Sequence, residues 1–395
     1  MKTQFVFTSE SVTEGHPDKL CDQISDAVVD EYLRQDPLAR VSTECAVARG
    51  VIFIATRFAS VAMVDLPNVA RRIVREVGYD DSSFNAHDCS VLTQISEFES
   101  EPYVRRDERL LNEDELERFV AKDQVTVFGY ACRQTPGHIP LPIWLAHTLA
   151  RRLSAVRRDR VLPNLGPDGK TQVGIEFVNR QPQRIHSLTL VASQNKHSDT
   201  KLDALREALY EHVIEPVFRD EELRPDRSTK LFLNPDGAFT GGPSYHAGLT
   251  GRKTAVDTYG EYCRHSGAAL SGKDPLRIDR VGAYAARHVA KNIVAAGLAA
   301  ECEVQLSYTI GLAGPVSINV ESFGSGRISD NEIAQRIDAV FDLRLGAILR
   351  NFNLRWLPQE SKQGFYRRLA TYGHMGRVDL ELPWESTDMA APLCD

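Results

Sequence analysis

The sequence predicts an α+β fold built from three similar blocks. Amphipathic helical segments alternate with short apolar strands along the chain of 395 residues. The order helix, strand, strand, helix recurs, which is typical of sheets that carry helices on one face. Apolar runs such as the one at 51–55 have the length of a strand and are too short to cross a bilayer. Since the residues show no repeated sequence, the expectation of similar blocks rests on element order.

The first block is predicted to hold two helices and an apolar strand. A helix begins at Pro17, because a proline at the first helical position loses no hydrogen bond. Its apolar side chains then recur at helical spacing. A strand follows at 50–55, and a second amphipathic helix at 66–78 ends at Gly78, a residue type common at helix ends.

The other two blocks follow the same alternation. The second is predicted to contain a strand at 124–132, a helix at 141–157, paired strands at 170–177 and 185–193, and a helix at 201–218. The third is predicted to contain a strand at 229–235, a helix at 283–297, strands at 301–311 and 316–323, and a helix at 330–343. The expected domain bounds are 4–101, 123–229 and 230–395, with a charged lid or linker at 102–122.

The segment 96–123 between the first two blocks is strongly charged, and we expect it to be short of core residues. Asn112 and Glu115 have the spacing of a capping box before a short helix. The segment is either a solvated linker or a mobile lid over a site, and the sequence leaves both open.

Composition narrows the class of protein. The chain is 42% hydrophobic and 26% charged, which is ordinary for a globular protein, and its formal charge of −7 argues against a nucleic-acid partner. Its seven cysteines form no C-x-x-C pair, which fits a reducing compartment and indicates neither zinc nor disulfides. The first residues lack the apolar core of a signal peptide, so we expect a cytoplasmic protein without a membrane partner.

Two charged motifs suggest a site. His16, Asp18 and Lys19 crowd the start of the first helix; the alternative is ordinary helix-start chemistry, with Lys19 as a surface charge. The run from Gly267 to Lys273 has the spacing G-x-x-x-x-G-K, but Asp follows where a nucleotide-binding P-loop needs Ser or Thr. We therefore expect no P-loop, yet glycines beside basic residues suit an anion. The alternative is that this second motif belongs to an ordinary surface of mixed charge.

Several segments together resemble the S-adenosylmethionine synthetase family, also called methionine adenosyltransferases. They are FTSESVTEGHPDKLCDQISDAVVD, FGYA, GPDGKTQV, GLTGRKTAVDTYG, SGKDPLRIDR and AYAARHVAKNIVAAGLA, and the resemblance runs from about residue 5 to YGHMGR and PWE near the C-terminus. It implies three βαββαβ-type domains around a pseudo-threefold axis. It also implies a homodimer with active sites shared between subunits, and sometimes a homotetramer.

The resemblance implies transfer of the adenosyl group of ATP to the thioether sulfur of L-methionine, then hydrolysis of tripolyphosphate to pyrophosphate and phosphate. A thioether has no proton to remove, so the first step needs charge neutralisation at the leaving polyphosphate rather than a base. Lys, Arg, protonated His and Mg²⁺, two per site, would supply it, with K⁺ as a further cofactor.

Residue roles implied by the resemblance fall into three sets. The catalytic residues would be His16, Lys170, Arg252, Lys253 and Lys273. The ATP-binding residues would be these five together with Asp123, Asp168, Phe239 and Asp279. The metal ligands would be Asp18 and Asp279 for Mg²⁺ and Glu44 for K⁺.

The acceptor side departs from the family pattern. Arg57 and His246 stand where the family has acids facing the methionine ammonium, and Arg277 stands where a Lys usually binds. Three readings follow. The chain is a methionine adenosyltransferase with compensating substitutions, a family member that uses another thioether or acts mainly on ATP and tripolyphosphate, or a non-catalytic partner subunit.

Overall fold

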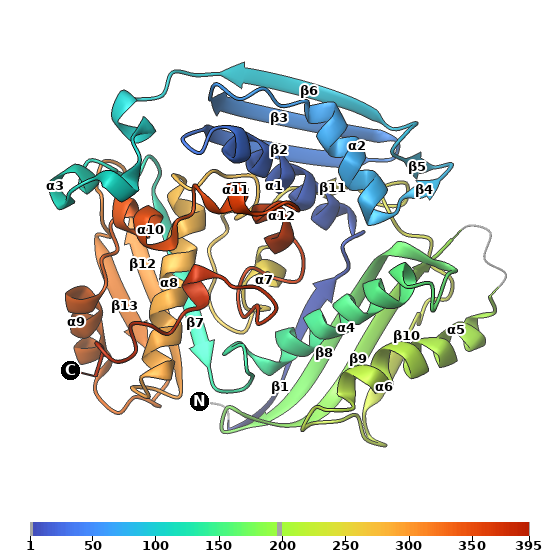
Figure 1. Ribbon diagram of the computed structural model, residues 1–395. Helices are drawn as coiled ribbons and strands as arrows, with labels where there is room; N and C mark the ends of the chain where they lie inside the picture. The colour runs from blue at the N-terminus through green and yellow to red at the C-terminus, as the bar shows by residue number, and fades with distance from the viewer. Residues whose placement is uncertain (1–2, 196–199, 395) are drawn as a thin grey trace.

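The computed structural model describes residues 3–195 and 200–394 and contains three sheets, each packed against helices, around a common centre (Figure 1). The first sheet has the order β11-β2-β3-β6. Its strands are β11 (Gly248–Leu249), β2 (Arg40–Ala48), β3 (Val51–Ala59) and β6 (Ser90–Glu97). The helices α1 (Pro17–Gln35) and α2 (Leu66–Val77) pack against it, and a small ribbon, β4 (Asp80–Asp81) with β5 (Phe84–Asn85), follows α2.

The second sheet has the order β1-β8-β9-β10. Its strands are β1 (Gln4–Val12), β8 (Leu165–Val178), β9 (Gln181–Gln194) and β10 (Lys230–Leu233). It is covered by α4 (Leu141–Arg158) and by a helical stretch made of α5 (Leu202–Leu209), a π-helical turn (Tyr210–Ile214) and α6 (Glu215–Phe218).

The third sheet has the order β13-β12-β7. Its strands are β13 (Ser317–Glu321), β12 (Glu301–Tyr308) and β7 (Val125–Cys132), and its helices are α8 (Ile278–Ala295) and α9 (Asp330–Val340). Shorter helices complete the chain: α3 (Glu113–Leu116), α7 (Thr254–Asp257), α10 (Leu345–Phe352), α11 (Leu357–Glu360) and α12 (Tyr366–Leu369). Short 3-10 turns lie at Pro102–Arg105, Glu108–Leu110 and Pro383–Glu385.

The predicted helix boundaries are confirmed where a cap residue marks them. Helix α1 starts at Pro17, and the Nδ1 atom of His16 accepts a hydrogen bond from the N–H of Asp18. Helix α2 ends before Gly78, which has the positive φ of 96° that a left-handed helix end requires. Helix α8 begins five residues before the predicted 283, because its first turn buries the charged Asp279 and Arg280 together with Ile278 and Val281, and this mixture shows no apolar period.

Strand membership departs from the predicted blocks. The strand at 124–132, assigned to the second block, is β7 and pairs with β12 of the third sheet. The strand at 229–235, assigned to the third block, is β10 and pairs in parallel with β9. The unpredicted strand β1 joins the second sheet beside β8. These three pairings join distant parts of the chain, which a local pattern cannot reveal. The domain bounds 4–101, 102–122, 123–229 and 230–395 describe chain segments and stay a prediction.

The expectation that the charged segment 96–123 is short of core residues is wrong. Val104, Leu111, Leu116 and Phe119 are buried, and the first three belong with Phe119 to the main hydrophobic cluster. The predicted capping box of Asn112 and Glu115 is present at α3. The segment is therefore packed into the fold through its sparse apolar residues and through Glu108, which is buried 3.3 Å from Arg355, while most of its other charged residues are exposed or half-buried.

One face of the first sheet is open. The inner face of β2 and β3 packs on α1 and α2, whereas Val51, Phe53, Leu92 and Leu249 on the outer face are 40–55% exposed. Figure 1 shows both helices on the same side of this sheet. No helix in the described part of the chain is long and apolar enough to cross a membrane.

Candidate functional site

The start of α1 is where most predicted site residues meet. The turn of β11 approaches it so closely that a Cβ on Gly248 would lie 2.1 Å from the carbonyl oxygen of Pro17. Only glycine fits this contact. It brings Arg252 and Lys253, four and five residues further on, to the first turn of α1. The first group, as we call it, consists of His16, Asp18, Asp168, Lys170, Phe239, His246, Arg252 and Lys253.

Asp18 lies at the centre of the first group. Its Oδ1 atom accepts a hydrogen bond of 3.0 Å from the N–H of Leu249 and lies 3.5 Å from Nη1 of Arg252. Its Oδ2 atom lies 3.7 Å from Nζ of Lys253 and makes no closer contact to a cation among the described residues. The carboxylate is buried. It therefore offers one oxygen to a hard cation, as the Mg²⁺ assignment requires.

His16 is a neutral ring in this structure. Burial lowers its pKa to about 3; the charge of Asp168 opposes this shift, and the positive charges of Lys253 and Lys170 add to it. Because Nδ1 accepts from the N–H of Asp18, the ring proton lies on Nε2. Burial therefore favours the neutral form of His16, whereas the resemblance implied a protonated histidine. His16 can donate a hydrogen bond, and the positive charge of the site comes from lysine and arginine.

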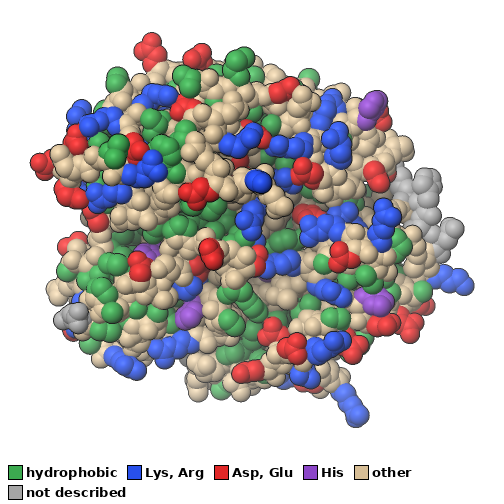
Figure 2. Space-filling model, viewed as in Figure 1, with side chains coloured by type: hydrophobic (Ala, Val, Ile, Leu, Met, Phe, Trp, Pro, Cys, Tyr) green, Lys and Arg blue, Asp and Glu red, His purple; other side chains and the backbone are tan. Residues whose placement is uncertain are grey.

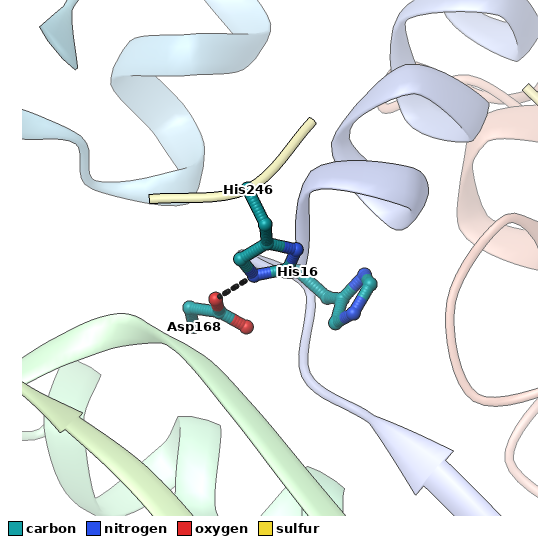
Figure 3. Close-up of side chains that lie close together, drawn as sticks. All are labelled: His16, Asp168 and His246. Carbon is teal, nitrogen blue, oxygen red and sulfur yellow. Dashed lines mark hydrogen bonds and ion pairs between the residues drawn. The ribbon is translucent and has the colours of Figure 1, made fainter. Parts of the chain in front are cut away.

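Asp168 and His246 form a hydrogen-bonded pair beside His16 (Figure 3). The Nε2 atom of His246 lies 2.8 Å from Oδ2 of Asp168, and the ring centroids of His246 and His16 are 5.0 Å apart. The N–H of Gly242 also donates to Oδ2. The Oδ1 atom of Asp168 is buried and accepts no hydrogen bond in the described structure, so it is available to a ligand donor.

These three side chains could each offer a ligand atom to a metal, since the atoms lie within 4.8 Å of one another. Their hydrogen bonds argue against it. The Nδ1 atom of His16 accepts from a backbone N–H, and the Nε2 atom of His246 binds the carboxylate of Asp168. The cluster is therefore a hydrogen-bonded group in which Oδ1 of Asp168 is a buried acceptor without a partner among the described residues.

Lys170 and Phe239 flank this pair. Lys170 lies on β8, two residues after Asp168, and its Nζ atom is 5.9 Å from the centroid of the Phe239 ring. The backbone of Phe239 is tied to the end of β9, where the N–H of Gln194 donates to its carbonyl oxygen. A cation beside an aromatic face suits a nucleotide, with its phosphates at the cation and its base on the ring.

A second group of predicted residues, Asp123, Lys273, Arg277 and Asp279, lies at the start of α8. The Nζ atom of Lys273 is 3.4 Å from Oδ2 of Asp279, and Arg277 donates to Asp123 at 3.1 Å. Burial lowers the pKa of Lys273, and the carboxylate of Asp279 partly offsets this. The Oδ2 atom of Asp279 is buried and accepts no hydrogen bond among the described residues, so it could bind a cation.

The glycine of the G-K pair at 272–273 serves the fold rather than an anion. Gly272 has φ 79°, its N–H donates to Oδ1 of Asp26, and a Cβ would lie 2.1 Å from the carbonyl oxygen of Thr43. The loop is thus pressed against β2 and α1. For Gly272 this corrects the expectation that the glycine lets the backbone approach a phosphate, whereas Lys273 itself stays a candidate.

Arg57 and Glu44 lie on the open face of the first sheet. Both are exposed, and Arg57 lies opposite Ser42 with its guanidinium 5.6 Å from the centroid of the Phe98 ring. Neither makes an ion pair within the described part of the chain. The two predicted acceptor residues Arg57 and His246 are therefore not brought together within one subunit.

The two groups lie at opposite ends of β2. Lys273 bridges to Ser42, and Gly248 pairs with Val47. Five residues of strand separate these points, so the two backbones are about 16 Å apart. The residues predicted to act together are thus split into two half-sites within one chain.

Sequence reasoning missed a buried network behind the first group. Lys19, expected at the surface in the plainer reading, is 1% exposed; its Nζ lies 2.8 Å from Oδ2 of Asp22 and binds Asp257 as well. Burial raises the pKa of Asp257 to about 7, although Lys19 counters this. Lys19 and Asp22 are three residues apart, and Asp257 is far away in the sequence. Charged residues with such spacing usually lie at the surface, so no local pattern identifies the buried network.

Comparison with known proteins places the chain in one class, enzymes built from three S-adenosylmethionine synthetase domains. Family models of the N-terminal, central and C-terminal domains of S-adenosylmethionine synthetase match residues 4–100, 118–239 and 240–386. The chain therefore belongs to the S-adenosylmethionine synthetase family.

Three cyanobacterial relatives named S-adenosylmethionine synthase are similar over almost their whole length. The protein of Gloeothece citriformis is 47% identical, with 100% of this chain and 98% of the relative covered. That of Microcystis aeruginosa is 47% identical, with the same coverage. That of a Synechococcus strain is 48% identical, with 98% of this chain and 97% of the relative covered.

Proposed function

We propose that this protein transfers the adenosyl group of ATP to the sulfur of methionine and then hydrolyses the tripolyphosphate. The thioether sulfur attacks C5′ of ATP, the C5′–O bond breaks, and tripolyphosphate leaves with the bonding electrons. Water then cleaves it to pyrophosphate and phosphate. The name S-adenosylmethionine synthase, carried by relatives 47% identical over the whole chain, supports this reaction. We also propose a cytoplasmic location.

The observation that carries the proposal is the first group at the start of α1. Lys170, Lys253 and Arg252 supply positive charge there, and neutral His16 supplies an N–H donor. A leaving tripolyphosphate needs such preorganised donors and charges, and they are worth most where water is excluded. Phe239 and the free Oδ1 atom of Asp168 would hold the adenosine portion.

We further propose two Mg²⁺ ions and one K⁺ per site. Oδ2 of Asp279, a buried oxygen 3.4 Å from Lys273, and Oδ2 of Asp18 fit Mg²⁺, which prefers carboxylate oxygens. When bound, Mg²⁺ would neutralise charge on the polyphosphate. Glu44 is the proposed K⁺ ligand, and its carboxylate lies on the exposed face of β2.

The complete site is proposed to form in a homodimer. A homotetramer would then be a pair of such dimers. The open face of the first sheet exposes Val51, Phe53, Leu92 and Leu249, and a second copy of the same face could cover them by two-fold pairing. Such pairing lets the first group of one subunit meet the second group of its partner. It would also unite Arg57 and His246, which one chain keeps apart.

The reaction is tested by competition among acceptors. With ATP and Mg²⁺, we expect methionine to give S-adenosylmethionine, and 4-(methylthio)butanoate and N-acetylmethionine to compete poorly. Mass spectrometry of the adenosylated products measures this. A preference for either amine-free or amine-blocked acceptor would instead favour the reading in which Arg57 repels the ammonium group and selects another thioether. Hydrolysis of ATP without any adenosylated product would contradict both.

Site sharing between subunits is tested by complementation. His16→Asn in the first group and Lys273→Ala in the second are each expected to slow adenosyl transfer about 100-fold as homodimers. When the two variants are co-expressed, half of the dimers are mixed, and each mixed dimer has one site free of both substitutions. Activity should then recover to about a quarter of the wild-type value.

The matched control combines two variants of the same group. Co-expressed His16→Asn and Lys253→Ala, both in the first group, leave every site of a mixed dimer with one defect, so no recovery is expected. If His16→Asn and Lys273→Ala also show no recovery although mixed dimers are isolated, each site lies within one subunit and the shared-site proposal is wrong.

A further inference from the structure

A cavity of about 650 Å³ lies between the N-terminal half of the chain and its C-terminal segment. Its walls come from α1, α2, α4 and the segment 358–380, and none of the candidate catalytic, metal or acceptor residues lines it. Figure 2, in the orientation of Figure 1, shows Lys and Arg side chains concentrated across the middle of this face. The volume is that of a small-molecule site.

The cavity is positively charged in a protein that is negatively charged overall. Eight Lys or Arg and five Asp or Glu line it, whereas the whole chain has a formal charge of −7. One of the five acids, Asp30, accepts hydrogen bonds from the N–H groups of Phe365, Tyr366 and Arg367. Burial raises its pKa to about 7, so part of its negative charge is absent at neutral pH.

The carboxylates in the cavity are shared between cations. Asp379 lies 2.8 Å from Arg377 and 3.3 Å from Arg151. The Nε atom of Arg151 is buried and donates to no described residue. Burial and the neighbouring Arg377 both lower the pKa of Arg151. Two guanidinium groups at one carboxylate leave donors unused, and an added anion would relieve their repulsion.

Glu31 repeats this arrangement at the other wall, where it binds both Arg34 and Arg72. Lys362 and Arg368 also line the cavity, are exposed, and form no ion pair within the described residues. The surplus of positive charge is therefore distributed around the cavity rather than held by one pair.

We propose that this cavity binds a small molecule with two or more phosphate groups. Such a molecule carries about three to four negative charges at pH 7, which matches the surplus in the walls. Guanidinium groups bind phosphate oxygens bidentately, and several of them face this space. The apolar lining is limited to Ala27, Pro358 and Leu380 with the ring of Tyr372, so the ligand is recognised by its charge.

Calorimetric titration with 2,3-bisphosphoglycerate tests the site without any need for catalysis. The wild-type protein should bind it, with affinity that falls as salt is added. The double variant Lys362→Ala/Arg368→Gln should raise the Kd at least about tenfold, because it removes two unpaired cations from the wall. Both side chains are exposed, so the fold should be kept, and an unchanged melting temperature verifies it.

Two controls separate this site from others. Lys201→Ala/Arg227→Gln removes two exposed cations outside the cavity and should leave the Kd unchanged. Lys273→Ala, in the second catalytic group, should also leave it unchanged. The proposal would be overturned if the wild-type protein did not bind 2,3-bisphosphoglycerate. It would also be overturned if Lys273→Ala lost binding while Lys362→Ala/Arg368→Gln bound normally. Equal affinity for citrate would contradict the preference for phosphate.

Discussion

Replacement of Asp18 by Asn is expected to lower ATP turnover by at least about 100-fold. The amide oxygen can still accept the hydrogen bond from the N–H of Leu249, so the first turn of α1 should keep its shape. What the change removes is the negative charge proposed to bind Mg²⁺ and to balance Arg252 and Lys253. Phosphate release and product mass measure the effect.

The control for this change is Asp159→Asn. Asp159 is exposed at the end of α4, outside both groups, and its replacement should leave turnover unchanged. Circular dichroism should show the same fold for all variants. Turnover of Asp18→Asn within threefold of the wild-type value would contradict the assignment of Asp18 as a metal ligand.

Replacement of Lys19 by Ala is expected to reduce the free energy of unfolding by about 3–5 kcal/mol, because it leaves two carboxylates buried without their cation. Burial already raises the pKa of Asp257 to about 7 and also raises that of Asp22. Loss of the ammonium group raises both further. A carboxyl with a raised folded-state pKa loses its stabilising contribution as pH increases, so the defect should be larger at pH 8 than at pH 6.

Urea unfolding at both pH values measures this effect. Lys230→Ala, which removes an exposed lysine on β10, should change stability by no more than about 0.5 kcal/mol. Addition of Asp257→Asn to Lys19→Ala should restore part of the loss, because it removes one of the unpaired charges. A Lys19→Ala protein as stable as the wild type would show that the network contributes little.

The local elements were predictable because their causes are local. Pro17 and Gly78 mark helix ends through their own backbone preferences, and the capping box of Asn112 and Glu115 needs only three residues of spacing. The family and its reaction were likewise indicated by short motifs around His16, Lys170 and Lys253. The close contact of Gly248 with Pro17 brings two of these motifs together, so that Lys253 lies 3.7 Å from Asp18.

The charge of His16 could not be predicted from its motif. A histidine at a helix start is usually open to water, and only the packing of β8 and the loop before β11 around it removes that water. The hydrogen bond of His246 was not predictable either. Its sequence position suggested an altered contact to an acceptor, and the structure adds a hydrogen bond to Asp168, more than seventy residues away.

The sequence by itself determined the long helices, the strands β3, β7, β8, β9, β10, β12 and β13, the family and the candidate site residues, because these depend on spacing, residue type and motifs along the chain. It did not indicate β1, β2, β6 or the short helices α10, α11 and α12. Only the tertiary structure decided that β7 and β10 belong to sheets other than those expected and that the unpredicted strand β1 joins the second sheet. It also decided that the site residues form two groups about 16 Å apart along β2. The reason is that strand pairing and burial are set by contacts between distant segments. Hydrogen bonds such as that from Gly272 to Asp26 fix those contacts, and no residue pattern within one segment carries them.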